Sequence, residues 1–163
     1  FTHLHLDHCG WTTVEEAGTR VLTYPNARWR VSKTEWEFWY GGDNPAGPHP
    51  EFVQAPLADK IEFVADGAEV APGVTMFATP GHTPGHVVFL YEAQKVAWVG
   101  DVLFQGSIGR TDFPRGDHQA LLDSIRRRIW PLGDDFTLLP GHGPTTTVGE
   151  ERAHNPFLQG SYG

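Results

Sequence analysis

Three histidines and an aspartate fall within six positions at the start of the chain, and no other segment constrains the fold as strongly. These residues are His3, His5, Asp7 and His8. Alternate side chains of an extended strand lie on one face, so we expect His3, His5 and Asp7 to point the same way. We expect His8 to join them where the chain turns. Neutral imidazole and ionised carboxylate bind zinc and other borderline divalent metals. The alternative is a polar loop of solvated histidines.

Three later turns carry the residues that would complete a metal centre. Each turn follows a predicted apolar strand, and they present His82, Asp101 and His142. A carboxylate at the end of a buried strand is costly unless it is paired or bound to metal. We therefore expect Asp101 to bridge two cations, with a turn or helix cap as the alternative. We expect His86, four residues after His82, to be an outer donor or a structural residue rather than a ligand.

The rest of the pattern interleaves strands with helices, which is typical of the α+β class. The expected strands are Ala27–Val31, Ile61–Val64, Val74–Ala78, Val87–Tyr91, Val96–Val99 and Phe136–Leu139. The expected helices are a short one within Cys9–Arg20, one from the cap Ser32 through Tyr40, one from the cap Asp117 to Pro131, and one from Thr147 to Pro156. Gly41–Pro50 is expected to be a loop. Trp36, Trp39 and Tyr40 share helical spacing, which favours core packing over a substrate wall.

The composition limits the partners of the chain. Its 163 residues fit one domain, and the net charge of −8 opposes binding to nucleic acid or an anionic membrane. No apolar run reaches the ~18 residues of a membrane span. Cys9 is the only cysteine, so the chain forms no internal disulfide. We expect Cys9 to be buried at a turn, with a ligand role as the alternative, and we expect a reducing, cytoplasmic location.

The start of the chain carries a further expectation. The first residue is Phe1, and the only methionine is Met76. Phe1 and Thr2 resemble the end of an apolar strand. We therefore expect residues 1–163 to form a single metallo-hydrolase domain that is truncated at its N-terminus.

Together the motifs resemble the metallo-β-lactamase superfamily. The resemblance implies an αββα sandwich, with its N-terminal strands missing here, and a pair of divalent metal ions. It implies that Asp7 and Asp101 are catalytic. Zinc is the expected metal, with iron or manganese as alternatives. By the same resemblance one ion would be held by His3, His5, His82 and Asp101, and the other by Asp7, His8, Asp101 and His142.

From about residue 79 to the end, the chain looks like the compact glyoxalase II-like hydrolases, most closely in the run Gly100–Asp117. This implies hydrolysis of a thioester of the hydroxyacylglutathione type by a hydroxide that two metals share. Arg110 falls near a basic residue that binds the glutathione carboxylate in that family. The alternative for Arg110 is an ion pair with Asp112 or Asp117. The sequence departs from the family after His142, where a glycine stands in place of the usual tyrosine.

Other functions remain as alternatives. Residues 11–75 resemble the lactonase and organophosphate-hydrolase branch, so a lactonase of the acyl-homoserine lactone type is the first alternative. The thioester is favoured because a thiol, with a pKa of about 8.5, leaves more readily than an alkoxide. Persulfide dioxygenases share the Gly-Arg-Thr-Asp-Phe run but bind a single iron. An inactive metal-binding fragment is the second alternative, and the acidic charge disfavours a nuclease.

Overall fold

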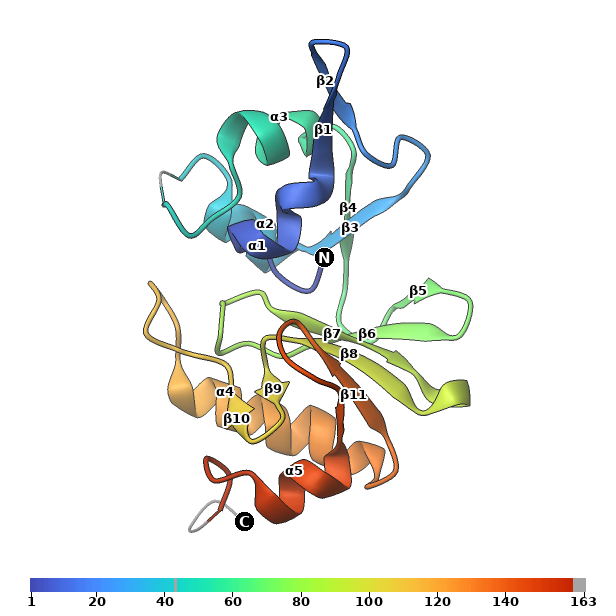
Figure 1. Ribbon diagram of the computed structural model, residues 1–163, viewed down its shortest axis with the longest axis vertical. Coiled ribbons are helices and arrows are strands. Elements are labelled where there is room, and N and C mark those ends of the chain that lie inside the picture. The colour runs from blue at the N-terminus through green and yellow to red at the C-terminus, as the bar shows by residue number, and fades with distance from the viewer. Residues whose placement is uncertain (43, 160–163) are drawn as a thin grey trace.

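A six-stranded mixed sheet organises the protein (Figure 1) in the computed structural model, which describes residues 1–42 and 44–159. Its strands lie in the order β12-β11-β8-β7-β6-β5, with β11 parallel to β8 and every other pair antiparallel. The strands of this sheet are β5 (Glu69–Ala71), β6 (Val74–Ala78), β7 (Val87–Tyr91), β8 (Val96–Gly100), β11 (Thr137–Pro140) and β12 (Thr146–Thr147).

Helices cover one face of this sheet, and a second, smaller unit lies against the other (Figure 1). The covering helices are α4 (His118–Ser124) and α5 (Val148–His154). The smaller unit holds the parallel pair β3 and β4 together with three helices. Its elements are α1 (Leu6–Cys9), β1 (Thr13–Glu16), β2 (Thr19–Leu22), β3 (Trp29–Ser32), α2 (Lys33–Trp39), α3 (Ala55–Leu57) and β4 (Ile61–Val64). The mixed α and β class predicted from the sequence is confirmed.

Two hydrophobic clusters hold these layers together. One lies between the six-stranded sheet and α4, and includes Val99, Leu121 and Ile125. The other packs Leu4 against Trp36 and the rest of the smaller unit. Burial of Trp36 and Trp39 confirms the predicted core role of these residues, whereas Tyr40 is half exposed. The segment that carries the first histidines is thus anchored in one cluster, and the strands that present the later ligands are anchored in the other.

Three helices begin at the predicted caps. Ser32 accepts a hydrogen bond from the backbone N–H of Glu35 at 3.1 Å, and Asp117 accepts one from Ala120 at 2.9 Å. Thr147 accepts one from the N–H of Glu150 at 3.1 Å. Each side-chain oxygen satisfies an amide that has no partner in the first helical turn. The capping-box pattern at Ser32 is only half used, because the Glu35 carboxylate turns into the interior instead.

The prediction for Cys9–Arg20 is wrong. The helix lies earlier, at α1, and Thr13–Glu16 and Thr19–Leu22 form the antiparallel hairpin β1–β2. Ala17 and Gly18 both have positive φ and make its two-residue turn. β-branched residues on both sides of this turn favour strands over a helix. Because the chain is already helical at Leu6, strand alternation does not bring Asp7 to the face of His3 and His5.

Other differences are smaller. Helical turns continue from α4 through Leu132, because Pro131 lies in the first turn of a 3₁₀ segment, where its missing N–H costs little. The predicted strand Phe136–Leu139 begins one residue later. The sequence analysis missed the helical turns Pro50–Gln54 and α3, the short strands β5 and β12, and the hairpin of β9 (Leu103–Phe104) and β10 (Ser107–Ile108). The expected loop Gly41–Pro50 includes residue 43, which lies outside the described residues.

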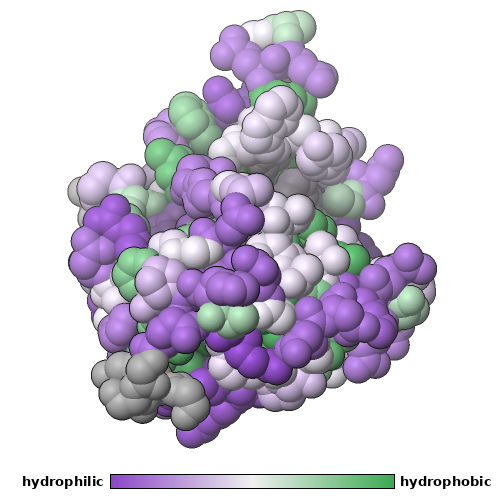
Figure 2. Space-filling model, turned by 60° about the horizontal axis from the view of Figure 1, so that its bottom comes forward, coloured by the Kyte–Doolittle hydropathy of each residue, from purple (hydrophilic) through white to green (hydrophobic). Residues whose placement is uncertain are grey.

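The outer side of the helical layer is polar. In Figure 2 this side is largely purple, with small separate patches of green. The apolar residues of α4, such as Leu121 and Leu122, are buried against the sheet instead. Within residues 1–42 and 44–159, we find no helix with the length and apolar character needed to cross a membrane.

Candidate metal centre

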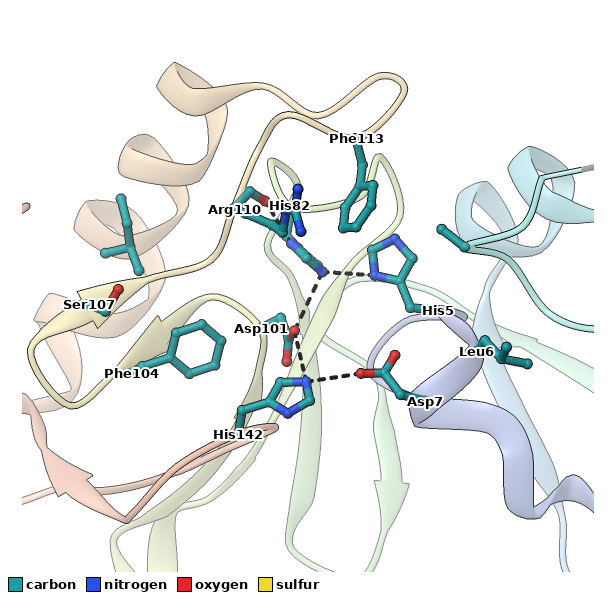
Figure 3. Close-up of a pocket in the computed structure, with 12 residues that line it drawn as sticks. His5, Leu6, Asp7, His82, Asp101, Phe104, Ser107, Arg110, Phe113 and His142 are labelled. Carbon is teal, nitrogen blue, oxygen red and sulfur yellow. Dashed lines mark hydrogen bonds and ion pairs between the residues drawn. The ribbon is translucent and has the colours of Figure 1, made fainter.

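The seven predicted ligands lie close together, and five of them, His5, Asp7, His82, Asp101 and His142, line a common cavity (Figure 3). His3 and His5 precede α1, while Asp7 and His8 lie on it. The other three follow strands: His82 comes after β6, Asp101 directly after β8, and His142 after β11. The structure therefore brings all seven together, although as many as 139 positions separate them along the chain.

His3, His5 and His82 form what we call the inner group. One nitrogen from each lies within 4.8 Å of the others. The Nε2 atom of His82 is 2.9 Å from the Nδ1 atom of His5. All three side chains are buried, with at most 5% exposure. The inner group thus offers three imidazoles that solvent scarcely reaches.

Asp7, His8 and His142 form the outer group, which meets the same 4.8 Å criterion. The Nε2 atoms of His8 and His142 are 3.1 Å apart, and the Oδ2 atom of Asp7 is 3.2 Å from Nε2 of His142. The side chains of Asp7 and His142 are 59% and 55% exposed. Asp7 and His142 are therefore open to the cavity and to water, whereas the side chain of His8 is 13% exposed.

Asp101 lies between the two groups. Its Oδ2 atom is 3.6 Å from Nε2 of His82 and 3.5 Å from Nε2 of His142. Its Oδ1 atom is 3.4 Å from Nε2 of His8. One carboxylate thus faces ligands of both groups, as a bridging position requires.

Unpartnered atoms show that this donor set fits divalent cations. Within the described part of the chain, Nε2 of His3, Nε2 of His5 and Oδ1 of Asp101 are buried without a hydrogen-bond partner. Such atoms are costly unless something binds them. A Cβ at Gly141 would come within 2.2 Å of Oδ1 of Asp101, so only glycine lets this loop close over the carboxylate. Imidazole nitrogens and a carboxylate suit zinc, iron or manganese.

The environment holds the inner imidazoles in the neutral form that binds metal. Burial lowers the pKa of His3 far below its usual range, and burial together with His82 lowers the pKa of His5 to about 4. Burial also lowers the pKa of His82. His8 differs: burial opposes its protonation, but the nearby carboxylate of Asp101 raises its pKa. The same contact with His8 lowers the pKa of Asp101 against the effect of burial.

Residues outside the two ligand groups orient His82 and the turn that carries Asp101. Nδ1 of His82 is 2.8 Å from the backbone oxygen of Arg110, so this nitrogen donates and Nε2 is left to bind metal. His86 belongs to neither group, and its Nε2 accepts a hydrogen bond from the backbone N–H of Asp101 at 3.0 Å. Thr79 lies 3.0 Å from the other nitrogen of His86. His86 therefore fixes the turn that carries Asp101.

The cavity beside the ligands has a volume of about 750 Å³ and a largely apolar wall. Its apolar lining comes from Leu6, Ala46, Phe104, Ile108 and Phe113. The ring of Phe113 packs on His5 with centroids 4.7 Å apart. None of these wall residues was identified from the sequence. Only Phe113 had a usable signal there, because it belongs to the Gly-Arg-Thr-Asp-Phe run.

Arg110 lines the cavity, but its guanidinium is already paired. Its Nε and Nη2 atoms donate to the two carboxylate oxygens of Asp112, both at 2.6 Å. This pair lowers the pKa of Asp112 to about 2. The guanidinium also lies 4.3 Å from the ring centroid of Phe113. Of the two roles that the sequence left open for Arg110, the structure thus contains the internal ion pair, with Asp112 rather than Asp117.

Comparisons with known proteins place this centre in context. The profile of the family described as "Metallo-beta-lactamase superfamily" matches residues 1–142. The hydroxyacylglutathione hydrolase GloC of Haemophilus influenzae is 60% identical over 79 residues, which is 48% of this chain and 37% of that protein. The chain thus spans little more than a third of GloC.

Two solved structures are similar over nearly the whole chain. The B3 metallo-beta-lactamase BLEG-1 superimposes with a TM-score of 0.73 at 32% identity, covering 98% of this chain and 75% of that one. TTHA1623 in a di-iron-bound form also gives a TM-score of 0.73, at 30% identity, and covers 96% of this chain and 75% of that one.

Proposed function

The chain belongs to the metallo-beta-lactamase superfamily, as its ligand motifs predict, and on that premise we propose that it hydrolyses a small-molecule thioester of the hydroxyacylglutathione type. One observation carries this proposal: seven side chains that can bind metal come together from four separate places in the sequence, and five of them line a single cavity. The 60% identity to part of GloC supports the thioester as the substrate class.

In this proposal the inner group and Asp101 hold one divalent cation, and the outer group and Asp101 hold the other. When bound, such cations lower the pKa of a water molecule to near ~7 and polarise a carbonyl oxygen. The buried, unpartnered Nε2 of His3 and Oδ1 of Asp101 support this assignment. We propose zinc as the metal. Iron is the alternative, which the di-iron-bound form of TTHA1623 supports.

The protein's own residues have distinct roles in the proposed reaction. Asp7 lines the cavity with a half-exposed carboxylate, so it can accept a proton from the attacking water and pass it to solvent. Asp101 lies between the two ligand groups and would hold them at a fixed separation by binding both cations. Phe104 and Phe113 line the cavity with apolar surface, which keeps water away from a bound acyl group.

The lining of the cavity favours a leaving group that departs without an acid. Among its described residues, the histidines and aspartates belong to the two ligand groups or are Asp101. The polar residues left are Ser107 and Arg110, and Arg110 is paired with Asp112. A thiol, with a pKa of about 8.5, needs little protonation to leave, whereas an alkoxide needs a donor. This supports a thioester over a lactone.

An acyl-homoserine lactone is the second candidate, because the apolar wall of the cavity suits a fatty acyl chain. The paired state of Arg110 also weakens the case for an anionic thiol such as glutathione. A substrate panel tests the two candidates. We expect purified, zinc-loaded protein to cleave S-lactoylglutathione faster than an acyl-homoserine lactone, and the opposite order would reverse the ranking. No turnover of either would refute both.

A further inference from the structure

A buried glutamate outside the ligand set holds two ligand-bearing segments together. Glu35, on α2, has no solvent exposure. Its Oε1 atom accepts hydrogen bonds from the backbone N–H of Leu4 at 2.9 Å and the indole N–H of Trp39 at 2.8 Å. Its Oε2 atom accepts from the hydroxyl of Thr83 at 2.7 Å and the N–H of Gly85 at 3.1 Å. All four partners donate, which suits a carboxylate acceptor.

Two of these donors belong to the segments that present the inner group. Leu4 stands between His3 and His5, and Thr83 directly follows His82. The two segments are more than 70 residues apart in the sequence, yet one carboxylate accepts from both. Glu35 therefore links the two segments that carry the inner group, and it does not line the cavity.

The loop that follows His82 packs directly against the first turn of α2. A Cβ at Gly85 would lie 2.1 Å from the backbone nitrogen of Glu35. The hydroxyl of Ser32 also donates to the Gly85 carbonyl at 2.6 Å while it caps α2. The first turn of α2 thus fixes the position of this loop, and with it the backbone beside His82.

We propose that Glu35 is a positioning residue that sets the spacing of His3, His5 and His82 and thereby the affinity of the inner group for its cation. This inference rests on the metal centre of the proposed function. A ligand set that is already arranged binds metal more tightly than one that must be ordered on binding, and partners outside the ligand set typically contribute 10–100-fold, roughly, to affinity.

Glu151 provides a matched control within the same chain. It lies on α5 with 1% exposure, and it too accepts hydrogen bonds from a backbone N–H, a side-chain N–H and a threonine hydroxyl. These donors are Gly106, Asn155 and Thr146. They belong to the turn of the hairpin β9–β10, to the C-terminal cap of α5 and to β12, and none is next in sequence to a proposed metal ligand. Replacing Glu151 therefore removes a similar buried network without touching the inner group.

The test compares Glu35→Gln with Glu151→Gln in the whole chain. A glutamine amide at position 35 offers a donor where Gly85 also donates, so that contact is lost while the side chain keeps its volume. We expect both variants to melt at a lower temperature than the wild type. We expect only Glu35→Gln to weaken the tighter zinc site, by ~10–100-fold, with Glu151→Gln within about threefold of wild type. Zinc affinity is measured on metal-free protein by competition with a chromophoric chelator.

If Glu35→Gln does not fold, a second pair of variants, each of which removes a single hydrogen-bond donor, provides the same test. Thr83→Val removes one donor to Glu35, and Thr146→Val removes one donor to Glu151. Thr83→Val should weaken zinc binding more than Thr146→Val does. Equal zinc affinities within either pair of folded variants would overturn the positioning role while leaving the metal centre intact. Failure of the wild type to bind zinc would overturn the metal centre itself, and the role of Glu35 with it.

Discussion

The inner and outer groups use similar ligands in opposite surroundings. His3, His5 and His82 are buried, and burial lowers the pKa of each. Glu35 accepts hydrogen bonds from Leu4 and Thr83, which are their neighbours in the sequence. Asp7 and His142 are more than half exposed. A cation in the inner group would therefore meet buried ligands, whereas one in the outer group would meet mostly buried His8 together with Asp7 and His142, which water reaches. We therefore expect the inner group to fill first and to release its cation last.

The largest effect is expected where the two groups meet. Asp101→Ala removes the carboxylate that faces both, and it should lower kcat/KM by more than the ~10–100-fold typical of partners outside the ligand set. Steady-state rates with thioester and lactone substrates measure this. A variant that keeps a tenth of the wild-type rate would show that Asp101 does not bridge.

The next largest effect is the loss of a different zinc site when a ligand of the inner or of the outer group is replaced. His82→Ala should abolish the tighter zinc site, whereas His142→Ala should remove the weaker site and leave the tighter one within about tenfold of wild type. Elemental analysis after dialysis against a weak chelator gives the stoichiometry of each variant. If both variants lost the same cation, the inner and outer groups would not be distinct.

Acid should destabilise the metal-free protein through its buried histidines. Burial lowers the pKa of His5 to about 4 and that of His86 to about 3, whereas an unfolded histidine titrates near ~6.5. Between these values the unfolded chain binds more protons than the folded chain, so the free energy of unfolding falls as the pH drops from about 6.5 toward 4.

We expect this loss to be on the order of 1 kcal/mol or more, which lowers Tm by at least ~2–4 °C. Thermal melts of chelator-treated protein over this pH range measure it. The variant His154→Gln, which replaces a histidine with 72% side-chain exposure, serves as the control and should leave the profile unchanged. A Tm that stays constant down to about pH 5 would contradict the burial of neutral imidazoles.

The smallest effect on activity is expected at the ion pair of Arg110 and Asp112, whose side chains are both more than half exposed. Asp112→Asn frees the guanidinium for a carboxylate on the substrate. Exposed ion pairs are screened by water and contribute little, so kcat/KM for S-lactoylglutathione should rise by no more than about fivefold. A thioester with an uncharged thiol portion should be unaffected. Equal changes for both substrates would exclude Arg110 from carboxylate recognition.

The convergence of the seven predicted ligands could be anticipated from sequence because each is a residue type that a core does not otherwise need. Four of them crowd into one short segment, and the other three lie in turns after strands. The strands β4, β6 and β7 could be predicted for a similar reason, since their apolar runs are bounded by turn residues. Their limits match the expected ranges. The helix caps Ser32, Asp117 and Thr147 act through local hydrogen bonds, which sequence spacing also reveals.

What sequence could not provide depends on contacts across the fold. Glu35 resembles an ordinary capping-box residue, and only the fold shows that its carboxylate binds Leu4 and Thr83 instead. The hairpin β9–β10 has two residues in each strand, too few for an alternating pattern to show. The turn at Ala17 and Gly18 was missed, although the β-branched residues on both sides of it favour strands.

Zinc titration of the metal-free protein by calorimetry tests the central claim most directly. The account predicts two equivalents of zinc in two phases, with the weaker phase absent in His142→Ala and both phases disturbed in Asp101→Ala. A single equivalent in the wild type, or a titration that Asp101→Ala leaves unchanged, would contradict a two-cation centre built from these seven side chains.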